Sequence, residues 1–135
     1  MANFLYDAIR KKMLEGDFNW KLNTIKAVLI DTSQYTPNQA FHEYLSDVPI
    51  SARVATSSAF TNKSTVGGAA DADDLVFQSV SGPTIKAIII YRDFGADNKS
   101  DLIAYIDSSA GLPIAPNGND IIIVWDNGPN KIFKP

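Results

Sequence analysis

Apolar residues recur at helical spacing in the first sixteen residues of the chain. Leu5, Ile9 and Met13 are four residues apart, so in a helix they would lie along one side. Asn3 is suited to cap the start of this helix, and Gly16 is suited to end it in a left-handed conformation. The pattern predicts an amphipathic helix in residues 1–16 whose apolar side must pack against another part of the protein.

From residue 24 onward, short runs rich in β-branched and aromatic residues alternate with turn-forming Gly, Pro, Asn and Asp. The absence of helical spacing between these runs favours antiparallel strands over β–α–β units. We therefore predict a mainly β fold, an antiparallel β-sandwich of jelly-roll type with one N-terminal amphipathic helix. A single domain of residues 1–135 contains the helix (1–16) and the sandwich (24–135). The predicted strands are 24–31, 50–56, 74–80, 84–92, 101–107, 120–126 and 131–134, the last two joined by a turn at Asn127–Gly128.

The strands predicted at 84–92, 101–107 and 120–126 carry apolar residues on both faces. A half-buried strand alternates apolar and polar residues, whereas these have apolar side chains at consecutive positions. One face can pack on the opposite sheet, and the helix can cover part of the other. We expect the remainder to contact another subunit. The candidate interface residues are Phe4, Leu5, Ile9, Met13, Ile88, Ile90, Ile122 and Val124.

An alternative keeps the same apolar surface within one chain. The connections at 37–49 and 111–119 are long enough to fold over a sheet, and residues 38–45 could hold a short helical turn. Exposed apolar area alone does not decide between a partner subunit and a covering loop. Both interpretations remain open at the level of the sequence.

Composition excludes several classes of site. The chain has no cysteine and one histidine, which removes disulfides, thiolate or multi-histidine metal sites and cysteine nucleophiles. The net charge of -3 argues against a nucleic-acid-binding protein. The apolar runs are too short to cross a membrane, and the start of the chain does not have the order of a secretory signal. We expect a protein made in the cytoplasm of its host cell, without membrane or nucleic-acid partners.

Candidate reactive groups have ordinary structural interpretations. His42 has acidic neighbours, but no nucleophile elbow is present, so a surface histidine is favoured over a small hydrolase. The aspartates of Asp71–Asp74 have spacing that could suit calcium, yet the glycine and glutamate of an EF-hand are missing, which favours a solvated loop. We therefore predict no enzyme activity, no cofactor and no metal.

Segments spread over nearly the whole chain resemble, in amino-acid sequence, small virion structural proteins of tailed bacteriophages. They are MANFLYD (1–7), EGDFNW (15–20), TIKAVLIDT (24–32), LSDVP (45–49), VATS (54–57), LIAYID (102–107), GLPIAP (111–116) and WDNGPNKIFK (125–134). Within this class the chain most resembles head decoration, or cement, proteins.

This resemblance implies a small β-rich subunit that forms a homotrimer, binds the major capsid protein and reinforces contacts between capsomers in the virion. A tail, neck or fibre component is the alternative. Such a component could bind host glycans through an aromatic groove, for which the candidates are Trp20, Tyr35, Phe41 and Tyr44, although aromatic residues at such positions are more often core residues.

Overall fold

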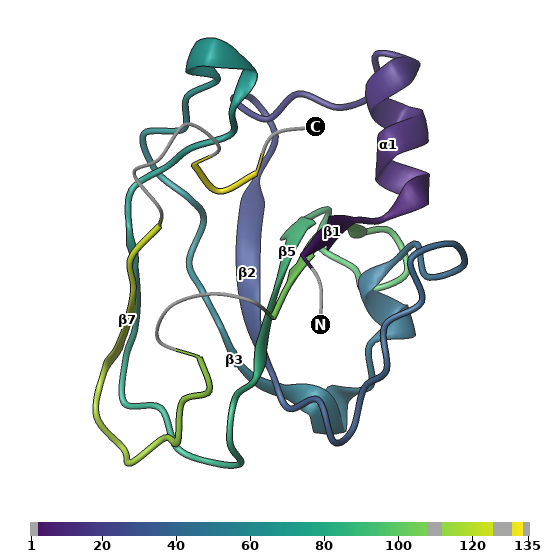
Figure 1. The fold of residues 1–135 in the computed structure, drawn as a ribbon. Coiled ribbons are helices and arrows are strands. Elements are labelled where there is room, and N and C mark those ends of the chain that lie inside the picture. Colours follow the sequence, from purple (N-terminus) through teal and green to yellow (C-terminus); the bar gives the residue numbers. More distant parts are fainter. Residues whose placement is uncertain (1–2, 108–111, 126–130, 134–135) are drawn as a thin grey trace.

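The computed structural model describes residues 3–107, 112–125 and 131–133, which form a mainly β fold with two antiparallel sheets and one α-helix (Figure 1). The predicted fold class is confirmed at this level. The elements in chain order are β1 (Phe4–Leu5), α1 (Asp7–Leu14), β2 (Ile25–Ile30), the 3₁₀ turns η1 (Leu45–Asp47) and η2 (Ile50–Ala52), β3 (Arg53–Thr56), the 3₁₀ turn η3 (Val66–Gly68), β4 (Leu75–Phe77), β5 (Ala87–Arg92), β6 (Asp101–Ile106) and β7 (Ile121–Ile123).

The larger sheet has five strands in the order β1-β6-β5-β2-β3. Val28, Ile89 and Tyr105 are in register across β2, β5 and β6, so their side chains share one face, and Ala27 and Ile90 share the other. Every residue of β5 and β6 is buried. Both faces of the central strands are therefore covered, as strands without polar alternation require.

The cover on the two faces comes from the chain itself. In Figure 1 the central strands lie between β7 on the left and α1 on the right. On the face that carries Tyr105, the ring of Phe4 stacks on it with centroids 5.3 Å apart, and Tyr35 from the connection after β2 lies 6.4 Å away. The long connection between β2 and β3 thus contributes to the core instead of standing in solvent.

The smaller sheet consists of β4 and β7, and only one of its two faces is buried. Leu75 pairs with Ile123 and Phe77 with Ile121, and these four side chains are buried. Val76 pairs with Ile122 between them and points to the opposite face. One face of this sheet therefore joins the core, while the other is open to solvent.

The N-terminal helix is shorter than predicted. It begins at Asp7, because Phe4 and Leu5 extend the large sheet by pairing with Tyr105 and Ala104 of β6. Asn3 does not cap the helix, and its side chain accepts a hydrogen bond from the backbone N–H of Asp107 (3.0 Å). The prediction of a helix through residues 1–16 is wrong at its start, whereas Gly16 has the positive φ (75°) expected after its end.

The strand predictions differ from the structure mainly in length. Those at 24–31, 74–80, 84–92, 101–107 and 120–126 contain β2, β4, β5, β6 and β7. The strand predicted at 50–56 is wrong in its first part, because residues 50–52 form the turn η2 and only residues 53–56 form β3. At 131–134 the structure shows an isolated bridge between Ala70 and Phe133, and the turn predicted at Asn127–Gly128 lies outside the described residues. In the described part of the chain no helix is long and apolar enough to span a membrane.

Candidate functional site

Four of the predicted interface residues are buried in their own chain. Ile88 and Ile90 belong to the fully covered strand β5, and Leu5 and Ile9 pack in the same hydrophobic core. Phe4 and Met13 are partly buried against that core. The expectation that these side chains form an open surface needs correction, because the chain itself supplies the cover that a second subunit was expected to give.

The other two predicted interface residues are exposed. Ile122 and Val124 have 63% and 65% of their surface open to solvent, and Val76, the cross-strand neighbour of Ile122, has 50%. The three side chains lie on the outward side of β4 and β7, and we call them the outer apolar face. Three exposed β-branched side chains grouped on one sheet are unusual unless another surface covers them.

Carboxylates bound the outer apolar face at both ends. Asp74, next to β4, accepts a hydrogen bond from the backbone N–H of Trp125 (3.0 Å). Asp120, next to β7, accepts one from the backbone N–H of Ser79 (2.9 Å). These bonds hold the ends of the two strands together, and the charges discourage a further strand from pairing there.

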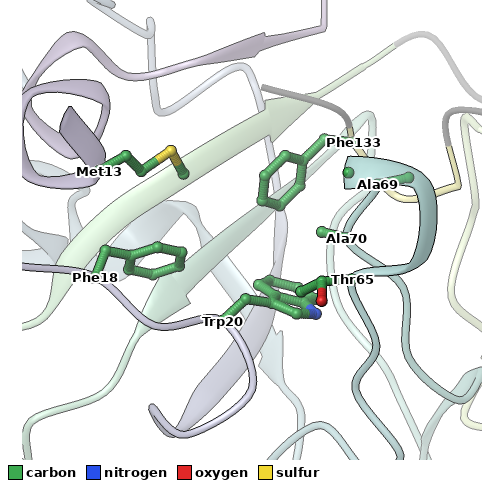
Figure 2. Close-up of a pocket in the computed structure, with 8 residues that line it drawn as sticks. Met13, Phe18, Trp20, Thr65, Ala69, Ala70 and Phe133 are labelled. Carbon is green, nitrogen blue, oxygen red and sulfur yellow. The ribbon is translucent and has the colours of Figure 1, made fainter. Parts of the chain in front are cut away.

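A second apolar feature is a pocket of about 260 Å³ (Figure 2). In Figure 2 Met13 and Phe18 lie on one side of it, Phe133 and Ala69 lie on the other, and Trp20 lies below. Its lining residues are Met13, Phe18, Trp20, Thr65, Gly68, Ala69, Ala70 and Phe133. The pocket is thus formed where the end of α1 and the segment after it approach the turn η3 and the far end of the chain.

The packing of Trp20 fixes the base of this pocket. Its indole N–H donates to the backbone carbonyl of Asp71 (3.0 Å), and its ring meets Phe60 and Phe133 edge to face at 5.8 and 5.3 Å. Because the indole N–H is already used, the pocket offers little hydrogen bonding and suits an apolar group. Leu14 and Val66, next in sequence to two lining residues, are 91% and 83% exposed.

A buried cluster of charges joins α1 to the large sheet. The Arg92 side chain on β5 donates to Oδ2 of Asp101 on β6 from Nε (2.8 Å) and Nη2 (2.7 Å), and both side chains are almost wholly buried. Its Nη1 donates to the carbonyl of Asp17 (2.6 Å), and the Lys12 ammonium on α1 bonds to Oδ1 of Asp101. Burial alone would disfavour the charge on Lys12, but the hydrogen bond to Asp101 raises its pKa above the ordinary value. The cluster therefore fixes the helix in place.

His42 lies in the connection between β2 and β3 and is half-buried. Its Nδ1 is 2.9 Å from the hydroxyl of Tyr35 and accepts a hydrogen bond from the backbone N–H of Asn38 (3.1 Å). These are neighbours in the same connection. The imidazole thus has a structural role that the prediction of a simple surface histidine did not include.

The acidic segment Asp71–Asp74 forms hydrogen bonds with several other segments of the chain. The carboxylate of Asp73 accepts from Thr61 Oγ1 (2.9 Å) and Asn62 Nδ2 (2.6 Å). In the described residues, no three acidic or histidine side chains are grouped closely enough to hold a metal ion. The Asp74 carboxylate and the backbone carbonyls of Asp71 and Asp73 also accept hydrogen bonds from Trp125 and Trp20, so the two tryptophans tie this segment to the core.

The four aromatic candidates for a glycan groove are spread over the surface and the core. Trp20 is buried at the apolar pocket and Tyr35 beside Tyr6, while the Lys12 ammonium lies over the Tyr44 ring at 5.3 Å. Phe41 is 82% exposed. Within the described ranges no ring contact joins two of these four candidates.

The outer apolar face and the apolar pocket are therefore the surfaces best suited to contact another molecule. Sequence reasoning named Ile122, Val124 and Met13 as interface residues and Trp20 as a glycan-groove candidate. It missed Val76 and the other pocket residues, which come from distant parts of the chain. No protein-family model matches the chain, and no curated protein is significantly similar to it.

Proposed function

We propose that this chain is a head decoration (cement) protein of a tailed bacteriophage, a non-enzymatic virion component that forms a homotrimer and binds the major capsid protein. In this proposal the subunits assemble onto the head in the host cytoplasm and reinforce contacts between capsomers. The resemblance of segments along the whole sequence to small virion proteins supports the assignment to this class. The structure contributes the surface with which such a protein would assemble.

The outer apolar face is the observation that carries the proposal. A chain of 135 residues buries the apolar residues of β5 and β6 completely, yet leaves Val76, Ile122 and Val124 open. Exposed apolar patches on small β-rich proteins are typical of contact surfaces. A structural role in an assembly uses such a surface without requiring any reactive group.

A ring of three subunits needs two different surfaces on each copy, because a cyclic trimer is closed by head-to-tail contacts. The chain offers the outer apolar face and the pocket flanked by Leu14 and Val66. In the proposed trimer these two surfaces meet between neighbouring copies. Three capsid contacts in one trimer would then act together, so that weak individual contacts give firm attachment.

The finer fold class belongs to the same proposal. We infer that the two sheets pack face to face as a sandwich, with jelly-roll connections as its most specific form. The buried faces of both sheets and the contact between Phe60, after β3, and Trp125, after β7, at 5.8 Å support the packing. An experimental structure with inner sheet faces about 10 Å apart would agree with a sandwich, and sheets that meet only at their edges would contradict it.

Imaging of virions that carry this chain tests the function directly. A peptide tag on the chain, detected by immunogold labelling, should give label distributed over the head lattice. A matched particle with Ile122→Asp should lose that label while the soluble protein stays folded. Label confined to the tail, or virions without the protein, would refute the assignment as a decoration protein.

A tail, neck or fibre component is the second candidate, favoured by the exposed ring of Phe41 (82%) in the connection between β2 and β3. An exposed aromatic ring can stack on the apolar face of a sugar. A glycan array that shows binding by the wild-type chain, lost on Phe41→Ala, would support this candidate. The decoration proposal expects no difference between the two proteins on such an array.

A further inference from the structure

Three side chains form a line of hydrogen bonds from the start of α1 to the connection between β2 and β3. The hydroxyl of Tyr6, the residue before α1, is 2.9 Å from the hydroxyl of Tyr35, which is 2.9 Å from Nδ1 of His42. Tyr6 and Tyr35 are buried, with 0% and 4% of their surface exposed. Buried hydroxyls need partners, so the arrangement of protons along this line matters for the fold.

One backbone group fixes the direction of all these bonds. The N–H of Asn38 donates to Nδ1 of His42 (3.1 Å), so Nδ1 carries no proton. The hydroxyl of Tyr35 must then donate to Nδ1, and its oxygen must accept from the hydroxyl of Tyr6. The imidazole is therefore neutral, with its proton on Nε2, and Nδ1 accepts from two donors.

We propose that His42 is an acid-sensitive latch, which as a neutral imidazole ties Tyr35 to Asn38 within the segment 35–42 and loosens this segment over the start of α1 when Nδ1 takes up a proton. A protonated Nδ1 is a donor that faces the N–H of Asn38, and two donors cannot bond to each other. The hydroxyl of Tyr35 could turn so that its oxygen accepts from the protonated Nδ1. The Asn38 N–H would still lose its acceptor. Proton uptake therefore removes at least one hydrogen bond from the closed arrangement.

The groups around the imidazole do not compensate for this loss. Tyr105 on β6 and Tyr6 are neutral, and the carboxylate of Asp47 in η1 accepts hydrogen bonds from the backbone N–H groups of Glu43 (2.8 Å) and Tyr44. The Glu43 carboxylate lies 3.7 Å from Lys12 Nζ. Among the described residues, none of these carboxylates forms a hydrogen bond or ion pair with His42. Asp47 attracts the imidazolium at longer range but cannot accept from Asn38.

The segment held by the latch also contacts the junction of β1 and α1. The backbone N–H of Asp7 donates to the carbonyl of Gln39 (3.0 Å), and the side-chain amide of Gln39 donates to the carbonyl of Leu5 (2.8 Å). Proton uptake by His42 leaves these two bonds, and the hydrogen bond between the Tyr6 and Tyr35 hydroxyls, as the ties between this segment and the start of α1. We expect acid to loosen the cover of the Tyr105 face locally, without unfolding the large sheet.

Nitrogen NMR of the full chain tests this inference, and the single histidine makes the assignment unambiguous. At about pH 8 the two imidazole nitrogens should show the neutral form with the proton on Nε2. As the pH is lowered from about 8 until the nitrogen shifts report proton uptake by His42, protection of the Asn38 amide from hydrogen exchange should fall by about tenfold relative to an amide in β5.

The matched variant is His42→Asn, whose carboxamide oxygen can accept from Asn38 but takes up no proton in this range. Its Asn38 protection factor should stay constant with pH. A neutral imidazole protonated on Nδ1 in the wild type would overturn the inference, and so would proton uptake by His42 with unchanged protection of Asn38. The wild-type measurements suffice if the variant does not fold, and they do not depend on the proposed virion function.

Discussion

Similar apolar runs differ in burial between the two sheets of this protein. β5 in the five-stranded sheet has five consecutive apolar or aromatic residues (Ala87–Tyr91) before Arg92, and β7 in the two-stranded sheet consists of three isoleucines. All six side chains of β5 are buried, between the rest of the core on one face and the α1 side on the other. On β7 the side chain of Ile122 is 63% exposed, because no described segment covers the outward side of β4 and β7.

This difference shows that apolar residues on both faces of a strand indicate a need for cover but not its source. For β5 the cover is internal, and for the outer apolar face we propose that it comes from a neighbouring subunit. The two regions should therefore respond oppositely to the same substitutions. Changes in the large sheet should alter folding, whereas changes on the outer apolar face should alter assembly.

The largest expected effect is loss of the fold in the double variant Ile88→Asp with Ile90→Asp. Each substitution places an unpaired carboxylate in the core, and each should cost more than about 4 kcal/mol of unfolding free energy. Circular dichroism and proton NMR should show an unfolded chain. The matched double variant Ile122→Asp with Val124→Asp should remain folded, and a folded core variant or an unfolded surface variant would break the comparison.

The second largest loss of stability is expected for Asp101→Asn, at the start of β6 in the large sheet. This change leaves the Arg92 guanidinium buried without its counter-ion, which should lower the unfolding free energy by about 3–5 kcal/mol in urea denaturation. The control is Asp97→Asn, because the ion pair of Asp97 with Arg53 (2.8 Å) is much more exposed, and its loss should cost less than about 1 kcal/mol. Equal losses of unfolding free energy in the two variants would show that burial does not determine how much the Arg92–Asp101 ion pair contributes to stability.

High pH should weaken the large sheet through its tyrosines. Burial raises the pKa of Tyr91 on β5 from 10.0 to about 12, so the unfolded chain loses this proton at a lower pH than the folded one. The stabilising effect is complete below pH 10 and should disappear as the pH rises towards 12. Urea midpoints measured across this range should fall, and Tyr91→Phe should fall less. A midpoint that is constant with pH would contradict the burial of this hydroxyl.

The smallest effect on folding is expected for Val124→Ser on the outer apolar face. Because the Val124 side chain is 65% exposed, the unfolding free energy of the isolated chain should change by less than about 0.5 kcal/mol. Attachment to phage heads, measured by co-sedimentation, should nevertheless decrease. Unchanged attachment to phage heads together with a large loss of unfolding free energy would contradict the assignment of assembly to the outer apolar face.

The sequence was enough to predict the β-rich fold and the positions of most strands, because β-branched runs between turn residues are a local signal. It was not enough to place the start of α1, since Phe4 and Leu5 fit an apolar helix side as well as an edge strand. The choice is made by the pairing of Phe4 with Tyr105, about a hundred residues away.

The candidate site was predictable only in part, for the same reason. The consecutive apolar residues around Ile122 and Val124 indicated two apolar faces, but whether a face is covered depends on distant segments such as the connection that holds Tyr35. The pocket combines Met13 and Phe133 from opposite ends of the chain. The buried pair of Arg92 and Asp101 likewise occupies strand ends, where charged residues are usually solvated.

Sedimentation velocity at micromolar concentration tests the central claim most directly, with wild-type protein and Ile122→Ser compared at equal concentration. We predict that the wild-type chain sediments as a trimer and that the variant, with unchanged circular dichroism, sediments as a monomer. A wild-type chain that stays monomeric, or a variant that still forms the trimer, would contradict the role of the outer apolar face as a subunit contact.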